Sequence, residues 1–488
     1  MSRAVLKGLA LLVAVATSAA LVAGATPAAG PPPPATQAQR PNIVFVLTDD
    51  LSWNLVRFMP NVLAMQREGM TFSNYFVTDS LCCPSRASIF TGRYPHNHGV
   101  LTNTAPWGGF AAFRRGAESS TFATGLHGTG FRTAMMGKYM NGYHPVGHYV
   151  PPGWSNWQVP GSAYRGFGYV LSSNGRTAHF GKRRRDYVTD VLRRRAKAFV
   201  GRVAAGRAPF MLEVATYAPH HPYTPAPRHR YDFPELQAPR TASFDRVTTD
   251  APEWLRDRLP LTPEQISALD RDFRKRAQSV QAVDDLIGQI RQELRSTGLD
   301  RNTYLVFSSD NGFHMGEHGL TAGKMTAFDT DIRVPLVVVG PGVSPGSVTD
   351  DLASNIDLAP TFMRLGGVQP PASVDGQSLI GLLQGDEPRS WRKALLVEHH
   401  RPETPNGDPD RQAAPSGTPP SYAALRTRFG TYVEYETGER EYYDLRTDPD
   451  ELHNIYDSLS AYERASLHER LTDLRDCRGA GCRAAAKE

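Results

Sequence analysis

Four apolar runs constrain the fold of this 488-residue chain more than any other feature. They are residues 43–48, 131–136, 210–216 and 303–309, and each stops at or shortly before polar residues. Runs of this length without alternating polar positions are typical of strands covered on both faces, as in parallel sheets. We therefore expect a large mixed, mostly parallel sheet.

Helical patterns separate these runs. Residues 187–203 carry apolar side chains on one side and arginines on the other. The clearest helix starts at Thr262, with Pro263 at its first helical position and Gln265 completing a capping box. Gly298 is suited to end this helix. The alternation of strands and helices predicts an α/β fold in which helices flank the sheet.

A Gly- and Pro-rich stretch near Gly366 indicates a boundary. We expect a large domain over residues 41–366 and a smaller α+β subdomain with antiparallel strands over residues 367–476. Within the smaller unit, the composition of residues 402–421 predicts a flexible loop. Residues 477–488 form a short tail.

The first 40 residues are expected to lie outside the fold. An apolar stretch over residues 8–22 follows two positive charges and precedes the small residues 23–25, as in signal peptides. We interpret residues 1–25 as a signal peptide and residues 26–40 as a Pro-rich linker. The mature protein would then be secreted and free of the membrane.

A formal net charge of only +5 does not favour nucleic-acid binding.

The four cysteines form two close pairs. In an exported protein, Cys477 and Cys482 are most simply joined in a local disulfide, and no nearby Cys or His offers zinc-ligand spacing. Cys82 and Cys83 are adjacent, and a bridge between neighbours requires strained geometry. This second pair therefore needs another explanation.

Polar residues follow the apolar runs at the positions where a site is expected. They are Asp49, Asp50, Lys138, His220, Asp310 and Asn311. In open α/β sheets, sites form beyond the carboxyl ends of the strands. We expect these side chains to converge.

The segment from Cys82 to Arg93 matches C-x-P-S-R-x-x-x-x-T-G-R, the signature of the sulfatase family. The chain resembles this family from Asn42 to about Asp457 and is most similar to its N-acetylglucosamine-6-sulfatase branch. The resemblance implies an alkaline-phosphatase-like fold with the catalytic residues in the large domain.

The resemblance also implies that Cys82 is oxidised to formylglycine by a formylglycine-generating enzyme during export. A hydrated aldehyde has two hydroxyls, one to attack sulfur and one to release sulfate afterwards. Pro84 suits the first turn of a helix, whose N-terminus would favour an anion near Cys82. Arg86 would hold the hydrate or a sulfate oxygen.

Further roles follow from the same resemblance. The family's metal ligands correspond to Asp49, Asp50, Asp310 and Asn311. Hard oxygen ligands of this kind suit Ca²⁺, or Mg²⁺ less well. Lys138 and Lys324, two of only 8 lysines, correspond to the lysines that neutralise the substrate sulfate. His220 corresponds to the proton donor near the leaving group, with His221 as the alternative.

One position departs from the family pattern. Many members have a histidine where this chain has Met140, so His98, His144, His314 or His318 would have to cover that role. Of these we favour His318, and we expect His318 and His98 to bind substrate. Candidates for a sugar pocket, or equally for core packing, are Trp107, Trp154, Trp157 and Tyr143.

These features together predict a secreted sulfatase that acts on a sulfated carbohydrate or an aryl sulfate, with glucosamine 6-sulfate as the expected substrate. A phosphodiester or phosphonate ester hydrolase is the alternative within the superfamily. A non-catalytic binder of sulfated glycans would result if Cys82 stayed unmodified. A thiol-redox or zinc protein is disfavoured by the spacing of Cys82 and Cys83.

Overall fold

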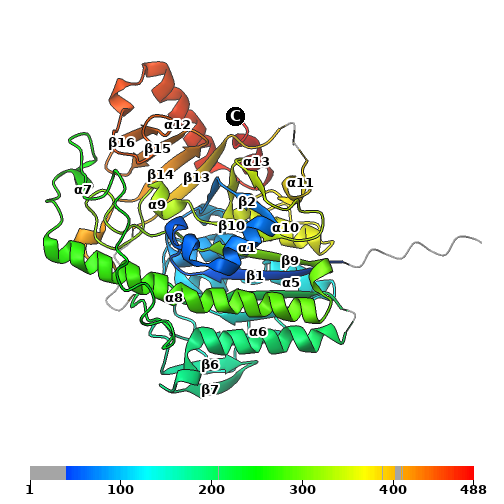
Figure 1. Ribbon diagram of the computed structural model, residues 1–488. Coiled ribbons are helices and arrows are strands. Elements are labelled where there is room, and N and C mark those ends of the chain that lie inside the picture. Colours follow the sequence, from blue (N-terminus) through cyan, green and yellow to red (C-terminus); the bar gives the residue numbers. More distant parts are fainter. Residues whose placement is uncertain (1–39, 207, 387, 389, 402–407, 409) are drawn as a thin grey trace, which may run out of the picture. The chain divides into compact units, whose positions relative to one another are not determined.

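A ten-stranded sheet forms the centre of the computed structural model (Figure 1). Its five middle strands, in the order β9-β1-β8-β4-β5, are parallel neighbours, and most of the strands beside them pair antiparallel. In spatial order the strands are β11 (Ser347–Thr349), β2 (Met70–Phe72), β10 (Leu336–Val339), β9 (Thr303–Ser309), β1 (Asn42–Thr48), β8 (Phe210–Ala215), β4 (Arg132–Gly137), β5 (Asn156–Pro160), β6 (Tyr169–Ser173) and β7 (Arg176–Phe180). The predicted mixed, mostly parallel sheet is confirmed, and the four apolar runs form β1, β4, β8 and β9.

The structure describes residues 40–488 apart from residues 207, 387, 389, 402–407 and 409. The expected signal peptide, and the linker up to residue 39, lie outside the described residues. Among the helices that are described, none has the length and apolar character needed to cross a membrane.

Both faces of the sheet are covered, which explains the unbroken apolar runs. On β1, Val44 and Val46 pack into one core, and Phe45 and Leu47 pack into the other. The first core is completed by α1 (Pro60–Glu68), α6 (Val188–Ala204) and α8 (Pro263–Ser296). The second is completed by α2 (Cys82–Thr91), α4 (Gly109–Gly116), α5 (Phe122–Gly128) and α10 (Leu358–Leu365). The shorter helices are α3 (Pro95–His98), α7 (Glu253–Arg256), α9 (Asp329–Ile332) and α11 (Ile380–Leu383), and β3 (Tyr75–Phe76) pairs with β12 (Ala353–Ser354).

The long helix α8 begins as the sequence predicts. Thr262 is its N-cap, its hydroxyl accepts from the backbone N–H of Gln265, and the Gln265 side chain accepts from the backbone N–H of Thr262. The helix runs for 34 residues beside α6 (Figure 1). Gly298, with a φ of +71°, follows its end.

A second, antiparallel sheet of four strands contains most of the C-terminal part. Its strands are β13 (Ala394–His399), β14 (Tyr422–Thr427), β15 (Gly430–Tyr435) and β16 (Arg440–Asp444). Helix α12 (Ala461–Asp476) packs Leu471 and Leu474 against Leu396 and Leu425 of this sheet. A disulfide joins Cys477 to Cys482, near the start of α13 (Ala480–Ala485). The expected smaller antiparallel α+β part is present, while the domain boundary at residue 366 stays a prediction.

A buried carboxyl in this sheet predicts a pH dependence of stability. Glu441 accepts hydrogen bonds of 2.7 Å from the hydroxyls of Tyr435 and Tyr443, and burial raises its pKa from 4.5 to about 7. Between these values the unfolded chain has lost a proton that the folded chain keeps, so the free energy of unfolding falls as pH rises through this window. Glu441→Gln should therefore be more stable than the unchanged protein above pH 7, by ~2 kcal/mol, with the difference shrinking towards pH 4.5.

Denaturant unfolding at a series of pH values measures this difference. The same exchange at exposed Glu469 serves as the control. A stability difference for Glu441→Gln that stays constant from pH 4.5 to pH 8 would contradict the prediction.

Candidate active site

Polar residues from four neighbouring parallel strands converge at one edge of the large sheet. Asp49 and Asp50 follow β1, Lys138 follows β4, and Asp310 follows β9. His220 lies five residues after the end of β8. Since the strands are adjacent in the order β9-β1-β8-β4, their carboxyl ends meet, as the sequence predicts.

Cys82 lies at the first position of helix α2, where the unsatisfied backbone N–H groups favour an anion. Its side chain is buried, with the Sγ atom 3.1 Å from Lys138 Nζ and 3.0 Å from Lys324 Nζ. Asp49 Oδ1 is 3.3 Å from the same sulfur. Burial, and after it the carboxylate of Asp410, raise the pKa of the Cys82 thiol well above its usual value, against the charges of the two lysines.

Cys83 is a different kind of thiol. It is buried in the core, and its Sγ accepts a hydrogen bond from the backbone N–H of Asn141 at 3.2 Å. Its own backbone N–H donates to Asn103 Oδ1 at 2.8 Å. Burial raises the pKa of Cys83 to about 12. Cys83 therefore packs in the core and is fixed by these two hydrogen bonds, while Cys82 faces the charged groups.

Arg86, one turn further along α2, joins the helix to the strand ends. It is fully buried, its Nε lies 2.8 Å from Asp310 Oδ2, and its Nη1 donates to the backbone carbonyl of Lys138 at 3.0 Å. Its Nη2 is 3.8 Å from Asp49 Oδ1 and has no hydrogen-bond partner among the described residues. Burial opposes the charge of Arg86, but Asp310 and Asp49 raise its pKa above the usual value.

The acidic residues are balanced by the two lysines. Both oxygens of Asp49 lie 2.8 Å from Lys138 Nζ, and Asp50 Oδ1 lies 2.7 Å from Lys324 Nζ. Burial works against the ionisation of Asp49, but Lys138 and its neighbouring cations lower its pKa to about 2. Burial raises the pKa of Asp310 to about 6, even with the charge of Arg86 beside it. The carboxylates at this edge are therefore not equivalent.

The donor set fits a hard divalent cation. Asp49 and Asp50 offer ligand atoms within 4.8 Å of one another in a cluster that also contains Cys82 and His220. Asn311 donates its amide to Asp50 Oδ1 at 2.7 Å, and its own carbonyl Oδ1 is buried without a hydrogen-bond partner in the described part of the chain. An orphaned amide oxygen beside carboxylates is suited to bind Ca²⁺ or Mg²⁺.

His220 is held as a doubly protonated ring. Its Nδ1 is 2.6 Å from the carbonyl oxygen of His221, and its Nε2 is 2.7 Å from Asp410 Oδ1. Both partners only accept hydrogen bonds, so both ring nitrogens carry a proton. Burial opposes this charge, but Asp50 and the other carboxylates raise the pKa of His220. His221, the alternative in the sequence, is exposed.

Of the histidines considered for the Met140 position, His144 is exposed, and His98, His314 and His318 have contacts elsewhere. Met140 packs in the core. His98 is hydrogen-bonded to Ser88 Oγ at 3.1 Å, and His314 is paired with Asp331 at 2.9 Å. His318 stacks on Phe328 with ring centroids 3.7 Å apart. Burial lowers the pKa of both His98 and His318 to about 3. Their roles in substrate binding stay predictions.

Sequence reasoning missed four residues that contact this site. They are Asn103, Asn141, Tyr164 and Asp410. The ring of Tyr164 packs at a tilt against His220, with ring centroids 4.5 Å apart, and lies under the ammonium group of Lys138. Asp410 belongs to the stretch 402–421, whose composition predicted only a flexible loop. No periodicity or motif marks these positions, because their role depends on how distant loops meet.

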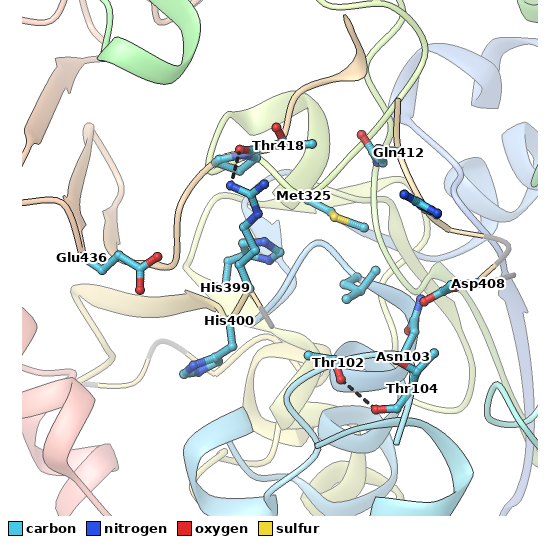
Figure 2. Close-up of a pocket in the computed structure, with 14 residues that line it drawn as sticks. Thr102, Asn103, Thr104, Met325, His399, His400, Asp408, Gln412, Thr418 and Glu436 are labelled. Atoms are coloured by element: carbon cyan, nitrogen blue, oxygen red, sulfur yellow. Dashed lines mark hydrogen bonds between the residues drawn. The ribbon is translucent and has the colours of Figure 1, made fainter. Parts of the chain in front are cut away.

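A cavity of about 620 Å³ is lined by Leu81, the residue before Cys82, and by residues of distant loops (Figure 2). Asn103 and Met325, the neighbour of Lys324, also line it. Figure 2 shows His399 and His400 on one side and Thr104 and Asp408 on the other. This volume is within the range of small-molecule sites. Of the aromatic candidates, Trp154, Trp157 and Tyr143 pack in the core, and Trp107 is exposed.

Comparisons with known proteins agree with this geometry. Residues 41–368 match the family described as Sulfatase, and residues 316–477 match the family described as N-sulphoglucosamine sulphohydrolase, C-terminal. The N-acetylglucosamine-6-sulfatase of Homo sapiens is 35% identical over 477 residues, which cover 91% of this chain and 86% of that protein.

Two solved structures extend the comparison. An enzyme in complex with its substrate D-glucosamine-2-N,6-O-disulfate has a TM-score of 0.75 and 25% identity, and the match covers 92% of this chain and 100% of the other. A phosphonate monoester hydrolase of Agrobacterium radiobacter has a TM-score of 0.68 and 23% identity, covering 89% of this chain and 95% of the other. The second likeness concerns the fold alone.

Proposed function

Because the chain belongs to the sulfatase family, we propose that it hydrolyses sulfate monoesters of carbohydrates, with glucosamine 6-sulfate as a substrate. The observation that carries this proposal is the position of Cys82. It lies at the head of α2 within the family motif, between two ammonium groups that are 3.0 and 3.1 Å from its sulfur. Such a position favours a bound anion.

The reacting residue is proposed to be formylglycine made from Cys82, and Cys82 Sγ marks the position of its reactive oxygen. Once hydrated, that group supplies one hydroxyl to attack sulfur and a second to release sulfate. Lys138 and Lys324 would neutralise the sulfate oxygens, and Arg86 would orient the residue at position 82. Each of these cations is held by a buried carboxylate, so their positions are set before substrate arrives.

His220 is proposed to donate the proton that the leaving oxygen needs. The carboxylates around it raise its pKa, so that the ring holds this proton near neutral pH. The carbonyl of His221 fixes the ring through Nδ1, which leaves the Nε2–H to face the reacting groups.

Asp49, Asp50, Asp310 and Asn311 would hold a divalent cation, which we propose to be Ca²⁺. When bound, it would neutralise charge on the substrate sulfate. The cavity that Leu81 and Asn103 line would receive the sugar, because its lining offers His399, Asn103 and Gln412 as hydrogen-bonding groups. The N-terminal sequence supports export, during which a formylglycine-generating enzyme would act on the unfolded chain.

Paired substrates test the reaction. We expect turnover of glucosamine 6-sulfate and of an aryl sulfate, with kcat/KM for the aryl sulfate at least a hundredfold above that for the matching aryl phosphate. Glucosamine 3-sulfate is the matched control for position. A higher kcat/KM on the phosphate ester would favour the alternative, a phosphodiester or phosphonate ester hydrolase. Turnover of the 3-sulfate without the 6-sulfate would refute the substrate assignment.

The two adjacent cysteines should have separate roles. Cys82→Ala should abolish turnover, whereas Cys83→Ala should keep much of it and lose about 1–2 kcal/mol of stability from the small cavity. Only Cys82 has proline two places on and arginine four places on, at Pro84 and Arg86. Mass spectrometry of the peptide containing residues 78–86 should find the aldehyde at Cys82. Fully active protein with both thiols intact would refute the formylglycine mechanism.

Cation binding should depend on Asn311 Oδ1, the buried amide oxygen without a hydrogen-bond partner among the described residues. Chelation should remove activity and Ca²⁺ should restore it. In calorimetric titration, Asn311→Ala should weaken Ca²⁺ binding at least tenfold because it removes one oxygen ligand. Asn141→Ala is the matched control, since that amide donates to Asp410 instead of Asp50. Equal Ca²⁺ affinity in Asn311→Ala and the unchanged protein would show that Asn311 is not a ligand.

A further inference from the structure

The carboxylate of Asp410 occupies the centre of the anion site. Its side chain is fully buried, and its Oδ1 lies 2.6 Å from Lys324 Nζ and 2.7 Å from His220 Nε2. The same oxygen has a hydrogen-bond contact of 3.8 Å with Cys82 Sγ. A lysine, the proton-donating histidine and the reacting residue therefore surround one oxygen of Asp410.

The second carboxylate oxygen of Asp410, Oδ2, also accepts two hydrogen bonds. Asn103 Nδ2 donates to Oδ2 at 2.6 Å, and Asn141 Nδ2 donates to it at 3.2 Å. The backbone N–H of Asp410 donates to the side chain of Asp408 at 2.9 Å. Both oxygens of this carboxylate thus accept hydrogen bonds from N–H groups. The same groups could donate to the oxygens of a sulfate.

Asp410 also lies at the cavities of this edge of the sheet. Asn103 and Asp408, which both bond to Asp410, line the cavity of about 620 Å³, and Asp410 itself lines a second cavity of about 210 Å³ together with His220 and Lys324. A sulfate ester that binds its sulfate to Lys324 and His220 has to place it where the Asp410 carboxylate now lies. Because both are anions that need Lys324 and His220, only one of them can be bound at a time.

We infer that Asp410 is a specificity-determining residue for the proposed reaction, on which this inference rests. Its carboxylate is a resident anion that competes with free sulfate and with small sulfate esters. A sulfated sugar displaces it, because contacts of the sugar with the cavity add to its affinity. When sulfate leaves as product, Asp410 takes its place on Lys324 and His220, so that the buried cations keep a partner.

Binding of inorganic sulfate tests this role directly. The dissociation constant of sulfate is measured by calorimetry on the intact protein, in parallel with its inhibition constant against an aryl sulfate. We expect Asp410→Ala and Asp410→Asn to bind sulfate at least tenfold more tightly and to lower KM for the aryl sulfate. The KM for glucosamine 6-sulfate should change less, because that substrate already displaces Asp410.

Asp408→Asn controls for a long-range effect of charge. It removes one negative charge from the same segment, keeps an acceptor for the Asp410 backbone, and should leave sulfate affinity within twofold. Unchanged sulfate affinity in both Asp410 variants, or an equal gain in Asp408→Asn, would overturn the inference. If the unchanged protein turns over no sulfate ester, the proposed function fails, while the calorimetric comparison still decides whether Asp410 competes for the anion site.

Discussion

Charge compensation among buried groups is the constraint on which the site depends. Asp49, Asp50 and Asp310 are removed from water, and each needs a cation to remain charged. Lys138, Lys324 and Arg86 supply those cations from a strand end, a loop and a helix. The ion pairs therefore tie separate elements together, and they hold the cations in place for chemistry.

The same arrangement favours an additional anion. Cys82 begins a helix, and two ammonium groups approach its sulfur. In the structure Asp410 supplies that anion, from the segment that joins β13 to β14. The small antiparallel sheet is thus more than an appendage, since its connection contributes a residue to the site and lines the adjacent cavity.

Several features of the large sheet and its helices could be predicted from the sequence. The strands of the large sheet are buried on both faces. Their sequences are therefore unbroken apolar runs, from which the strands were predicted. The start of the long helix α8 could be predicted because its cap is a local interaction over four residues. The metal-capable residues were predictable because they directly follow strands, and parallel strands bring their carboxyl ends together.

What the sequence alone determined was therefore local or repetitive: the strands, the capped helix, the motif around Cys82 and the polar residues behind each strand. Only the tertiary structure decided which side chains meet across long separations. It brought Asp410 onto Lys324 and His220, set Asn103 and Asn141 beside Asp410, and stacked His318 on Phe328. These contacts arise from loops, whose paths depend on the packing and charge of the whole chain and leave no periodic pattern in the residues themselves.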